Sequence, residues 1–294
     1  MTSRKIFLMT MLVVVLLAVL IWFYPSNSDF KGENPSWNGA RDFLSDFAVL
    51  PLSSLSALPA ISQETTLIVI PYVEFTSADL AKLKDYVNSG GTLVVLDDYG
   101  FGNEILEYLE LEIRFTGRQL LDPLFNYKNR NFPIIINFAS EPATSEVKSL
   151  VFNHATSLEN VSQDYVIAWS SYFSFLDENQ NGEWNDGEPK GLLPVIANSQ
   201  IGKGELISVA DPSLLINSML EMGDNRQFLK NLAQGQIFLD QSHLPEASLD
   251  EAKGKLKITR NVLATIWATL GLILLVLALT LRPIWNMRNP KQGE

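Results

Sequence analysis

One short acidic loop has the residue types best suited to binding an ion. Residues 177–188 read DENQNGEWNDGE and match the calcium-loop template D-x-[DN]-x-[DN]-G-x5-E along its whole length. Oxygen-bearing side chains recur at alternate positions, a glycine allows a sharp turn, and an acid closes the set, which suits Ca²⁺. The predicted ligands are Asp177, Asn179, Asn181, Glu183 (through its carbonyl oxygen), Asn185 and Glu188.

The flanks of this loop differ from those of a calcium sensor. The strand-like run YVIAWSSYFSF precedes it and Pro189 follows it, so the two helices of an EF-hand are missing. We therefore expect Ca²⁺ to have a structural role, at a site that extracellular calcium fills even at about millimolar affinity. The alternative is a solvated acidic turn that binds no ion.

Three further acids lie where predicted strands end. Asp97 and Asp98 follow one buried run, and Asp211 follows another. Ligands of open α/β sheets bind beyond the carboxyl ends of the strands, so these residues form a candidate ligand or metal site. The alternative is that they cap the helices that follow, and the Asp-Pro-Ser sequence at Asp211 is typical of a helix start.

Other catalytic chemistry has little support in the sequence. The chain has no cysteine, which excludes disulfides, cysteine-ligated zinc and a cysteine nucleophile. Its two histidines, His154 and His243, stand far apart without a motif around them, and neither G-x-S-x-G nor H-E-x-x-H occurs. A net charge of −11 repels nucleic acid and attracts cations. Whether the protein is an enzyme is uncertain, and the sequence favours a non-catalytic role.

The elements around these acids follow a β-α-β pattern. Residues 65–72 and 92–98 are short, continuous apolar runs, as in strands covered on both faces. Between them, Thr76 and Asp79 form a capping-box pattern at the start of a helix that ends at Gly90-Gly91. A unit of this kind closes right-handed into a parallel sheet.

Further elements complete an α/β domain. The sequence predicts strands over 133–138, 149–153 and 165–171, and an amphipathic helix over 224–234. Residues 192–212 predict a hairpin that turns at Gly202-Lys203-Gly204. The predicted fold class is α/β, with a mostly parallel sheet flanked by helices and one transmembrane helix at each end.

Two uncharged apolar segments predict the membrane helices. Residues 6–24 and 262–281 are each long enough to cross a bilayer. Arg4 and Lys5 precede the first and Arg282, Arg288 and Lys291 follow the second, so both termini are expected in the cytoplasm and the main domain outside the cell membrane. A cleaved signal peptide is the alternative for the first segment, and a buried core helix for the second.

This topology divides the chain into segments. The predicted segments are a tail (1–5), a transmembrane helix (6–24), a linker (25–35), an extracytoplasmic α/β domain (36–240), a linker (241–261), a transmembrane helix (262–281) and a cytoplasmic tail (282–294).

The run FTSADLAKLKDYVNSGGTLVVLDD resembles the core of class I glutamine-amidotransferase-like domains, which are related to flavodoxin-like folds. The later run GKGELISVADPSLLINSMLEMGDNRQFLKNL is similar to the end of an uncharacterised membrane-anchored family, catalogued as a domain of unknown function (4350 type). Its members have a strand ending in Asp-Pro-Ser and then an asparagine before a terminal helix, here Asp211 and Asn225. The amidotransferase activity requires a cysteine, so the resemblance transfers the fold and not that activity.

Together these observations predict a non-catalytic, membrane-anchored binding or scaffolding domain with a structural calcium loop. Its expected partners are the lipid bilayer and a membrane or envelope protein, and the resemblance suggests an accessory part of a transport or ATPase-linked envelope system. The alternative is a metal-dependent hydrolase that uses the strand-end aspartates.

Overall fold

The computed structural model describes residues 3–58, 65–233, 235–265, 269–271 and 273–274. The chain divides into two compact units, of which one is Pro25–Glu246 and the other combines Met1–Tyr24 with Ala247–Glu294. The larger unit is a mixed α/β domain built on one central sheet, and the smaller unit holds α1 (Ser3–Phe23) and α6 (Ser248–Leu263).

The central sheet has eight strands within the described residues, in the order β1-β14-β2-β3-β13-β12-β10-β7. The first five run parallel to their neighbours, and the last three alternate in direction. Their bounds, in sheet order, are β1 Leu50–Leu52, β14 Gln236–Asp240, β2 Thr65–Val69, β3 Thr92–Leu96, β13 Gly204–Val209, β12 Pro194–Ile201, β10 Val166–Trp169 and β7 Asn137–Phe138.

Short antiparallel pairs extend the domain beyond this sheet. They are β5 (Gln119–Leu121) with β11 (Phe175–Asp177), β4 (Arg114–Phe115) with β9 (Leu158–Glu159), and β6 (Ile134–Ile135) with β8 (Leu150–Val151). Four 3-10 turns are described, η1 Leu55–Ala57, η2 Pro142–Thr144, η3 Gln163–Tyr165 and η4 Pro212–Leu215.

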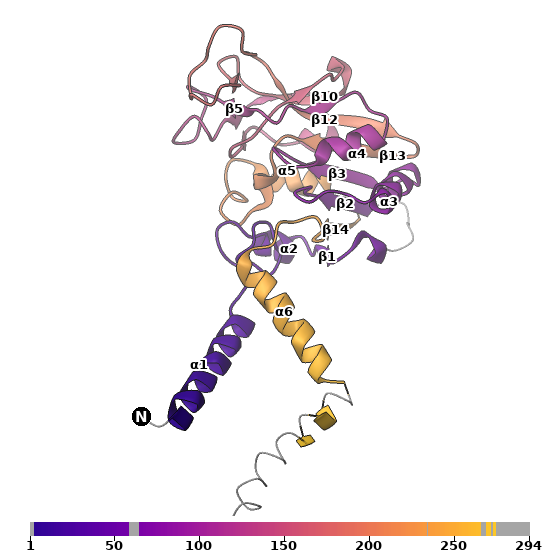
Figure 1. The fold of residues 1–294 in the computed structure, drawn as a ribbon. Coiled ribbons are helices and arrows are strands. Elements are labelled where there is room, and N and C mark those ends of the chain that lie inside the picture. Colours follow the sequence, from indigo (N-terminus) through magenta and orange to yellow (C-terminus); the bar gives the residue numbers. More distant parts are fainter. Residues whose placement is uncertain (1–2, 59–64, 234, 266–268, 272, 275–294) are drawn as a thin grey trace, which may run out of the picture. The chain divides into compact units, whose positions relative to one another are not determined.

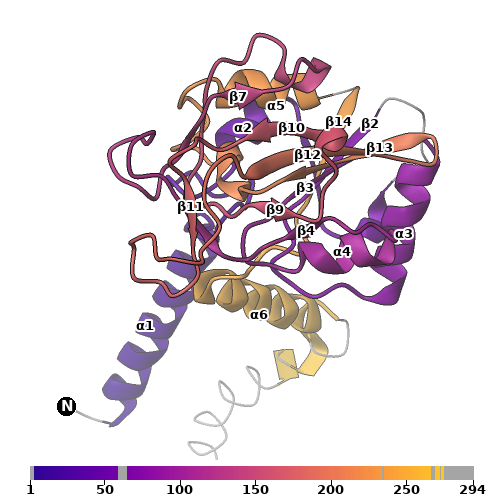
Figure 2. The same ribbon diagram turned by 90° about the horizontal axis from the view of Figure 1, so that it is seen from above.

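Helices cover both faces of the sheet. Figures 1 and 2 show α3 (Ser77–Asn88) and α4 (Gly102–Tyr108) on one face, with α2 (Arg41–Asp46) and α5 (Asn225–Leu232) on the other. Right-handed crossovers explain this arrangement, because α3 leads from β2 to β3 and α5 leads from β13 back in the opposite direction to β14. All residues of β2 and β3 are buried as a result.

The predicted β-α-β unit is confirmed in detail. Thr76 Oγ1 accepts a hydrogen bond from Asp79 N at 3.2 Å, and Asp79 Oδ2 accepts one from Thr76 N at 3.3 Å, which is the capping box that starts α3. Gly90 ends the helix at φ 114°. At Gly91, a Cβ atom would stand 2.4 Å from the Tyr86 ring, so the turn into β3 requires glycine.

The ends of the domain differ from the prediction. Residues 25–35 are predicted as a linker, but Phe30 and Asn34 are buried, and Phe30 stacks on Tyr72 with ring centroids 5.6 Å apart. Asn217 Nδ2 donates to Asn34 O at 3.3 Å and holds this turn-rich stretch against the domain. Residues 241–261, also predicted as a linker, contain the buried His243 and the start of α6.

Three strands, predicted over 133–138, 149–153 and 165–171, are shorter in the structure. Residues 133–138 form β6 and β7, which pair with different partners because the chain breaks at Ile136. The hairpin of β12 and β13 and the helix α5 lie where the sequence predicts them.

The smaller unit contains an apolar helix. Lys5–Phe23 within α1 is long and apolar enough to cross a membrane. The Arg260 guanidinium of α6 lies 5.5 Å from the Trp22 ring centroid, so the ends of these two helices meet through a cation–π contact. Most of the second predicted membrane helix, 262–281, and the tail 282–294 lie outside the described residues.

Candidate functional site

The carboxyl ends of the parallel strands bring polar side chains to one edge of the sheet. Asp97 and Asp98 follow β3, Asp211 follows β13, Tyr72 follows β2, and Asp240 ends β14. This edge is where open α/β sheets bind their ligands. The hydrogen bonds of each acid decide what it does there.

Asp97 closes the turn between β3 and α4. Its Oδ1 accepts from Gly100 N and its Oδ2 from Gly102 N, both at 2.8 Å. Gly102 is the first residue of α4, so the carboxylate satisfies amide groups at the start of that helix. Burial raises the pKa of Asp97 to about 7, although these hydrogen bonds oppose the rise.

Asp98 is tied to two tyrosines. Its Oδ1 accepts from the Tyr72 hydroxyl and from Tyr99 N, both at 2.6 Å. Burial raises the pKa of Asp98, and burial followed by the charge of Asp98 raises the pKa of Tyr72. The tyrosine is therefore neutral, and its hydroxyl donates a hydrogen bond to the carboxylate.

Asp211 is fully buried and bonded to two backbone amides. Its Oδ1 accepts from Ser213 N and its Oδ2 from Asn153 N, both at 2.7 Å. The first bond caps the 3-10 helix η4, as the Asp-Pro-Ser sequence predicts. Burial raises the pKa of Asp211 well above its ordinary value.

Asp97, Asp98 and Asp211 each accept hydrogen bonds from backbone amides. Residues close to Asp98 and to the partner of Asp211 line a cavity. A cavity of about 340 Å³ is lined by Tyr99, Gly117, Arg118, Gln119, His154, Asp177, Glu178 and Gln180. Asp98 holds the amide of Tyr99, and Asp211 holds the amide of Asn153, directly before His154. The strand-end acids thus position a pocket wall, and their side chains are not its lining.

The predicted calcium loop forms another wall of this cavity. Asp177 ends β11, and its two carboxylate oxygens accept from Asn181 N at 3.1 Å and Gly182 N at 2.7 Å. Glu188 accepts from Glu178 N at 3.0 Å and from Asn185 N at 2.8 Å. The first and last predicted ligands are both buried and close the loop onto itself.

The amide side chains converge inside the loop. Asn185 Oδ1 accepts from Asn179 Nδ2 at 2.5 Å and from Asn181 Nδ2 at 2.7 Å. Gly182 has φ 77°, the left-handed conformation expected of the turn glycine. The structure therefore brings three of the six predicted ligand side chains into contact with one another, while Asp177 and Glu188 bond to backbone amides of the loop and the Glu183 side chain is exposed.

The donor set of the loop fits a hard cation. Two carboxylates and three amides supply oxygen atoms, and rotation of an amide exchanges its nitrogen and oxygen. No three His, Cys, Asp or Glu side chains among the described residues group to hold a metal ion, so a cation here depends on the asparagines as well as the acids.

Contacts from outside fix the loop in place. Arg118 Nη1 lies 2.6 Å from Glu178 Oε1, and the Arg130 guanidinium donates to the carbonyl oxygen of Gly182. Trp184 Nε1 donates to Glu188 O at 3.1 Å. Lys190 Nζ lies 4.4 Å from the centroid of the Trp184 ring. Side chains of other segments, those of Arg118 and Arg130, therefore hold the loop in place.

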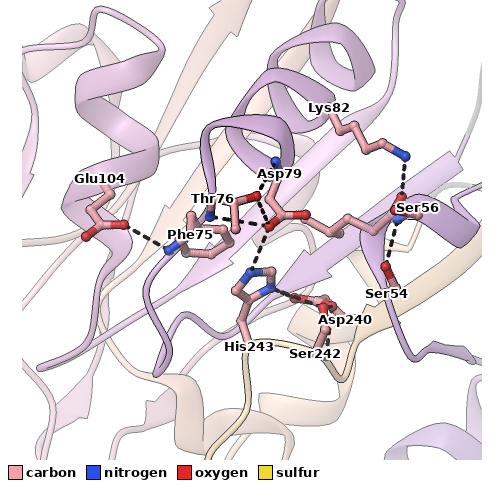
Figure 3. Close-up of polar contacts among 11 residues, drawn as sticks. Ser54, Ser56, Phe75, Thr76, Asp79, Lys82, Glu104, Asp240, Ser242 and His243 are labelled. Carbon is pink, nitrogen blue, oxygen red and sulfur yellow. Dashed lines mark hydrogen bonds and ion pairs between the residues drawn. The ribbon is translucent and has the colours of Figure 1, made fainter.

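Sequence reasoning missed a buried histidine cluster at the end of β14. Figure 3 shows His243 between two acids, with Nδ1 2.5 Å from Asp240 Oδ2 and Nε2 3.9 Å from Asp79 Oδ2. Phe75 stacks on the imidazole with ring centroids 3.9 Å apart. His243 is 5% exposed, so the cluster clamps the chain and is closed to substrate. Asp240 is three residues from His243, but Phe75 and Asp79 are far from it in the sequence, so residue spacing did not reveal the cluster.

Replacing Asp97 with asparagine is expected to flatten the pH dependence of stability. Its pKa rises from 3.8 to about 7 on folding, so between these values the folded state binds more protons than the unfolded chain. The stability that Asp97 contributes is complete below about pH 4 and is lost as the pH rises through about 7, at about 1.4 kcal/mol per pKa unit. Urea denaturation across this range should increasingly favour the variant as the pH rises. A constant difference from wild type would contradict the assignment.

Comparisons with known proteins place the chain in a family. The family model described as "Domain of unknown function (DUF4350)" matches residues 32–233. No curated protein matches the chain.

Solved structures show only distant similarity. The mmIFT52 N-terminal domain has a TM-score of 0.46 and 17% identity, over 63% of this chain and 82% of that one. A β-galactosidase from Bacillus circulans sp. alkalophilus has a TM-score of 0.34 and 12% identity, and the match covers 57% of this chain and 22% of the enzyme. These values carry no inference about activity.

Proposed function

We propose that the protein is a non-catalytic, membrane-anchored binding or scaffolding domain stabilised by calcium. The chain belongs to the DUF4350 family, whose description assigns no activity, so the proposal is argued from the site. The observation that carries this proposal is the loop 177–188, in which Asp177 and Glu188 are buried and bond to loop amides, and the side chains of three asparagines bond to one another.

Calcium would be held by the side chains of Asp177, Asn179, Asn181, Asn185 and Glu188, with the carbonyl oxygen of Glu183. The bound ion would neutralise the two buried carboxylates and rigidify the loop. Because Glu178 and Gln180 of the same loop line the cavity, a rigid loop also fixes the wall of a binding pocket.

The absence of catalysis in this proposal rests on the strand-end acids. The carboxylates of Asp97 and Asp211 are used by backbone amides, and that of Asp98 by Tyr72 and Tyr99. A metal-dependent hydrolase would need these acids to converge on an open cleft. The amidotransferase-like assignment stays a proposal about ancestry, supported by the β2-α3-β3 unit, in a chain without cysteine.

Membrane anchoring is supported by α1, which can cross a bilayer by length and composition. The cations near both termini support an orientation with those termini in the cytoplasm and the domain outside. A two-pass arrangement then holds the acidic domain in the calcium-rich compartment, next to a membrane or envelope partner such as a transport or ATPase-linked system.

Calcium is expected to raise the melting temperature of the full chain in lipid nanodiscs. At free calcium about 100-fold above Kd the stabilisation is about 2.7 kcal/mol, which corresponds to about 5 to 10 °C for a domain of this size. Thermal melts followed by circular dichroism, with calcium and after chelation, measure it.

A matched pair of variants identifies the site. The double variant Asp177→Ala/Glu188→Ala should lose the calcium response, whereas Asp186→Ala should keep it, because Asp186 is exposed in the same loop and occupies no ligand position of the template. An unchanged melting temperature of the wild-type protein over the calcium series would refute the proposed role.

A further inference from the structure

The cavity beside the calcium loop is assembled from four separate segments. Tyr99 follows β3, Arg118 and Gln119 lie at the start of β5, His154 lies between β8 and β9, and Glu178 and Gln180 belong to the loop. Its volume of about 340 Å³ is at the lower end of small-molecule pockets. A larger, more open hollow of about 620 Å³ around Arg114 and Asn160 lacks comparable support from the strand ends.

The backbone of the pocket wall is held in place from beneath. His154 has φ 53° and Gln180 φ 60°, a left-handed conformation that is uncommon for residues other than glycine. Asp211 fixes the chain at Asn153, and Asp177 fixes the turn that contains Gln180. Conformations of this kind persist where surrounding structure enforces them, often at ligand sites.

The charges of the pocket decide which ligands it accepts. The Arg118 guanidinium lies 2.6 Å from Glu178 Oε1 and 3.9 Å from Glu159 Oε2, so the cation of the wall is already paired with acids. An anionic ligand would meet the carboxylates of Asp177 and Glu178, and a cationic ligand would meet Arg118. An uncharged ligand avoids both repulsions.

The remaining groups offer both donors and acceptors. Gln119 Nε2 lies 3.2 Å from His154 Nδ1 and 3.2 Å from Asn131 Oδ1, which orients the amide and the imidazole. These two bonds use both amide hydrogens of Gln119, so its Oε1 is left to accept from a ligand, and an imidazole that accepts at Nδ1 has its Nε2 hydrogen left to donate. Hydroxyl groups also donate and accept, so they match such a wall better than purely donating or purely accepting ligands.

Tyr99 supplies an aromatic surface. Its hydroxyl donates to Ala155 O at 3.3 Å and its backbone amide to Asp98, so the ring is fixed at both ends. The side chain is nevertheless 47% exposed. A fixed, accessible ring beside polar groups suits a ligand with one apolar face and several hydroxyls.

We propose that this pocket binds a neutral, hydroxyl-rich small molecule of the saccharide class, with Tyr99 against its apolar face and Gln119, His154 and Gln180 bonded to its hydroxyls. This inference rests on the proposed role as a binding domain and not on the calcium site. It adds a ligand class to that role.

Saturation-transfer NMR on the full chain in lipid nanodiscs tests the ligand class. The neutral probes are galactose, N-acetylglucosamine and maltose, and the charged probes are glucuronate and glucosamine. At least one neutral sugar should bind, about tenfold or more tighter than both charged sugars. Tighter binding of a charged sugar, or no binding of any neutral probe, would overturn the proposal.

Variants locate the binding and separate it from calcium. Tyr99→Ala and Gln119→Ala should each weaken the neutral sugar about tenfold, and Tyr172→Ala should not, since Tyr172 is 72% exposed and outside the pocket lining. Binding that survives both pocket substitutions would also overturn it. Sugar binding without any calcium effect on melting would reject the calcium role and leave this inference standing.

Discussion

Asn225→Ala is expected to lower the free energy of unfolding by about 3 to 5 kcal/mol. The Asn225 side chain is fully buried, and its Nδ2 donates to Val151 O at 3.0 Å and Met219 O at 2.9 Å while its Oδ1 accepts from Val151 N at 3.0 Å. Alanine leaves three backbone groups without this partner, and each buried unsatisfied group costs about 1 to 3 kcal/mol.

The matched control lies on the same helix. Asn231 Nδ2 donates to Ala143 O at 3.1 Å and Ser145 O at 2.7 Å at a partly exposed position, where water can replace the lost donor. Asn231→Ala should therefore cost about 1 kcal/mol. Urea denaturation of the full chain in nanodiscs, followed by tryptophan fluorescence, compares the two. Equal losses would show that burial does not amplify the role of Asn225.

This result would explain the asparagine that the family resemblance singles out before the terminal helix. Asn225 is the first residue of α5 and binds both backbone groups of Val151 in β8. It therefore joins α5 to β8, a strand of the short β6–β8 pair outside the central sheet. The sequence pattern shows that asparagine stands there, and the structure provides the physical reason.

The local features of the fold are predictable from the sequence because their signals are short-range. The capping box of Thr76 and Asp79 sets the start of α3, and the Gly202-Lys203-Gly204 turn sets the register of β12 with β13. The buried apolar runs give β2 and β3. In each case the residues that determine the element lie within it or next to it.

Long-range pairing was not predictable. β14 follows α5 in the chain but inserts between β1 and β2, near the start of the domain. The local sequence QIFLD does not indicate that β1 and β2 are its neighbours. The same limit applies to residues 25–35, because a polar, turn-rich segment has the composition of a linker even where Asn217 binds the Asn34 carbonyl and holds it to the domain.

The same difference between short-range and long-range signals applies to the candidate site. The loop 177–188 is a local template, and in the structure its two end acids bond to loop amides while its three asparagine side chains bond to one another. The pocket joins Tyr99, Arg118 and His154 across the chain, so spacing could not reveal it. Sequence reasoning identified Asp98 and Asp211, but their role as supports of the pocket wall depends on hydrogen bonds to Tyr99 and Asn153.

His243→Phe is expected to lower the free energy of unfolding by about 3 kcal/mol. Phenylalanine keeps an aromatic ring against Phe75 and removes the nitrogen that bonds to Asp240, whose side chain is fully buried. Taking one partner from a buried polar or charged pair leaves the other desolvated without compensation. Asp240 then keeps only its bonds from Ser242 N at 3.0 Å and Ser242 Oγ at 2.6 Å.

A double-mutant cycle isolates this interaction from packing. Asp240→Asn removes the buried charge, so the second change, His243→Phe, should cost less in that background, with a coupling energy of about 1 kcal/mol or more. Ser242→Ala serves as the comparison, since Ser242 is exposed and water can replace its hydroxyl, and it should cost about 1 kcal/mol or less. Additive losses would show that His243 and Asp240 do not act as a pair.

Hydrogen exchange then shows what the clamp holds. Tyr72 N donates to His243 O at 3.0 Å, so the segment after β14 is bonded to the loop between β2 and α3. In the same loop, Phe75 N donates to Glu104 Oε2 at 3.1 Å (Figure 3). In His243→Phe the amide of Tyr72 should exchange faster than the amides of β3, because local opening precedes global unfolding. The Tyr72 hydroxyl also binds Asp98, so loosening the last residues of the domain would disturb the strand-end acids that position the pocket.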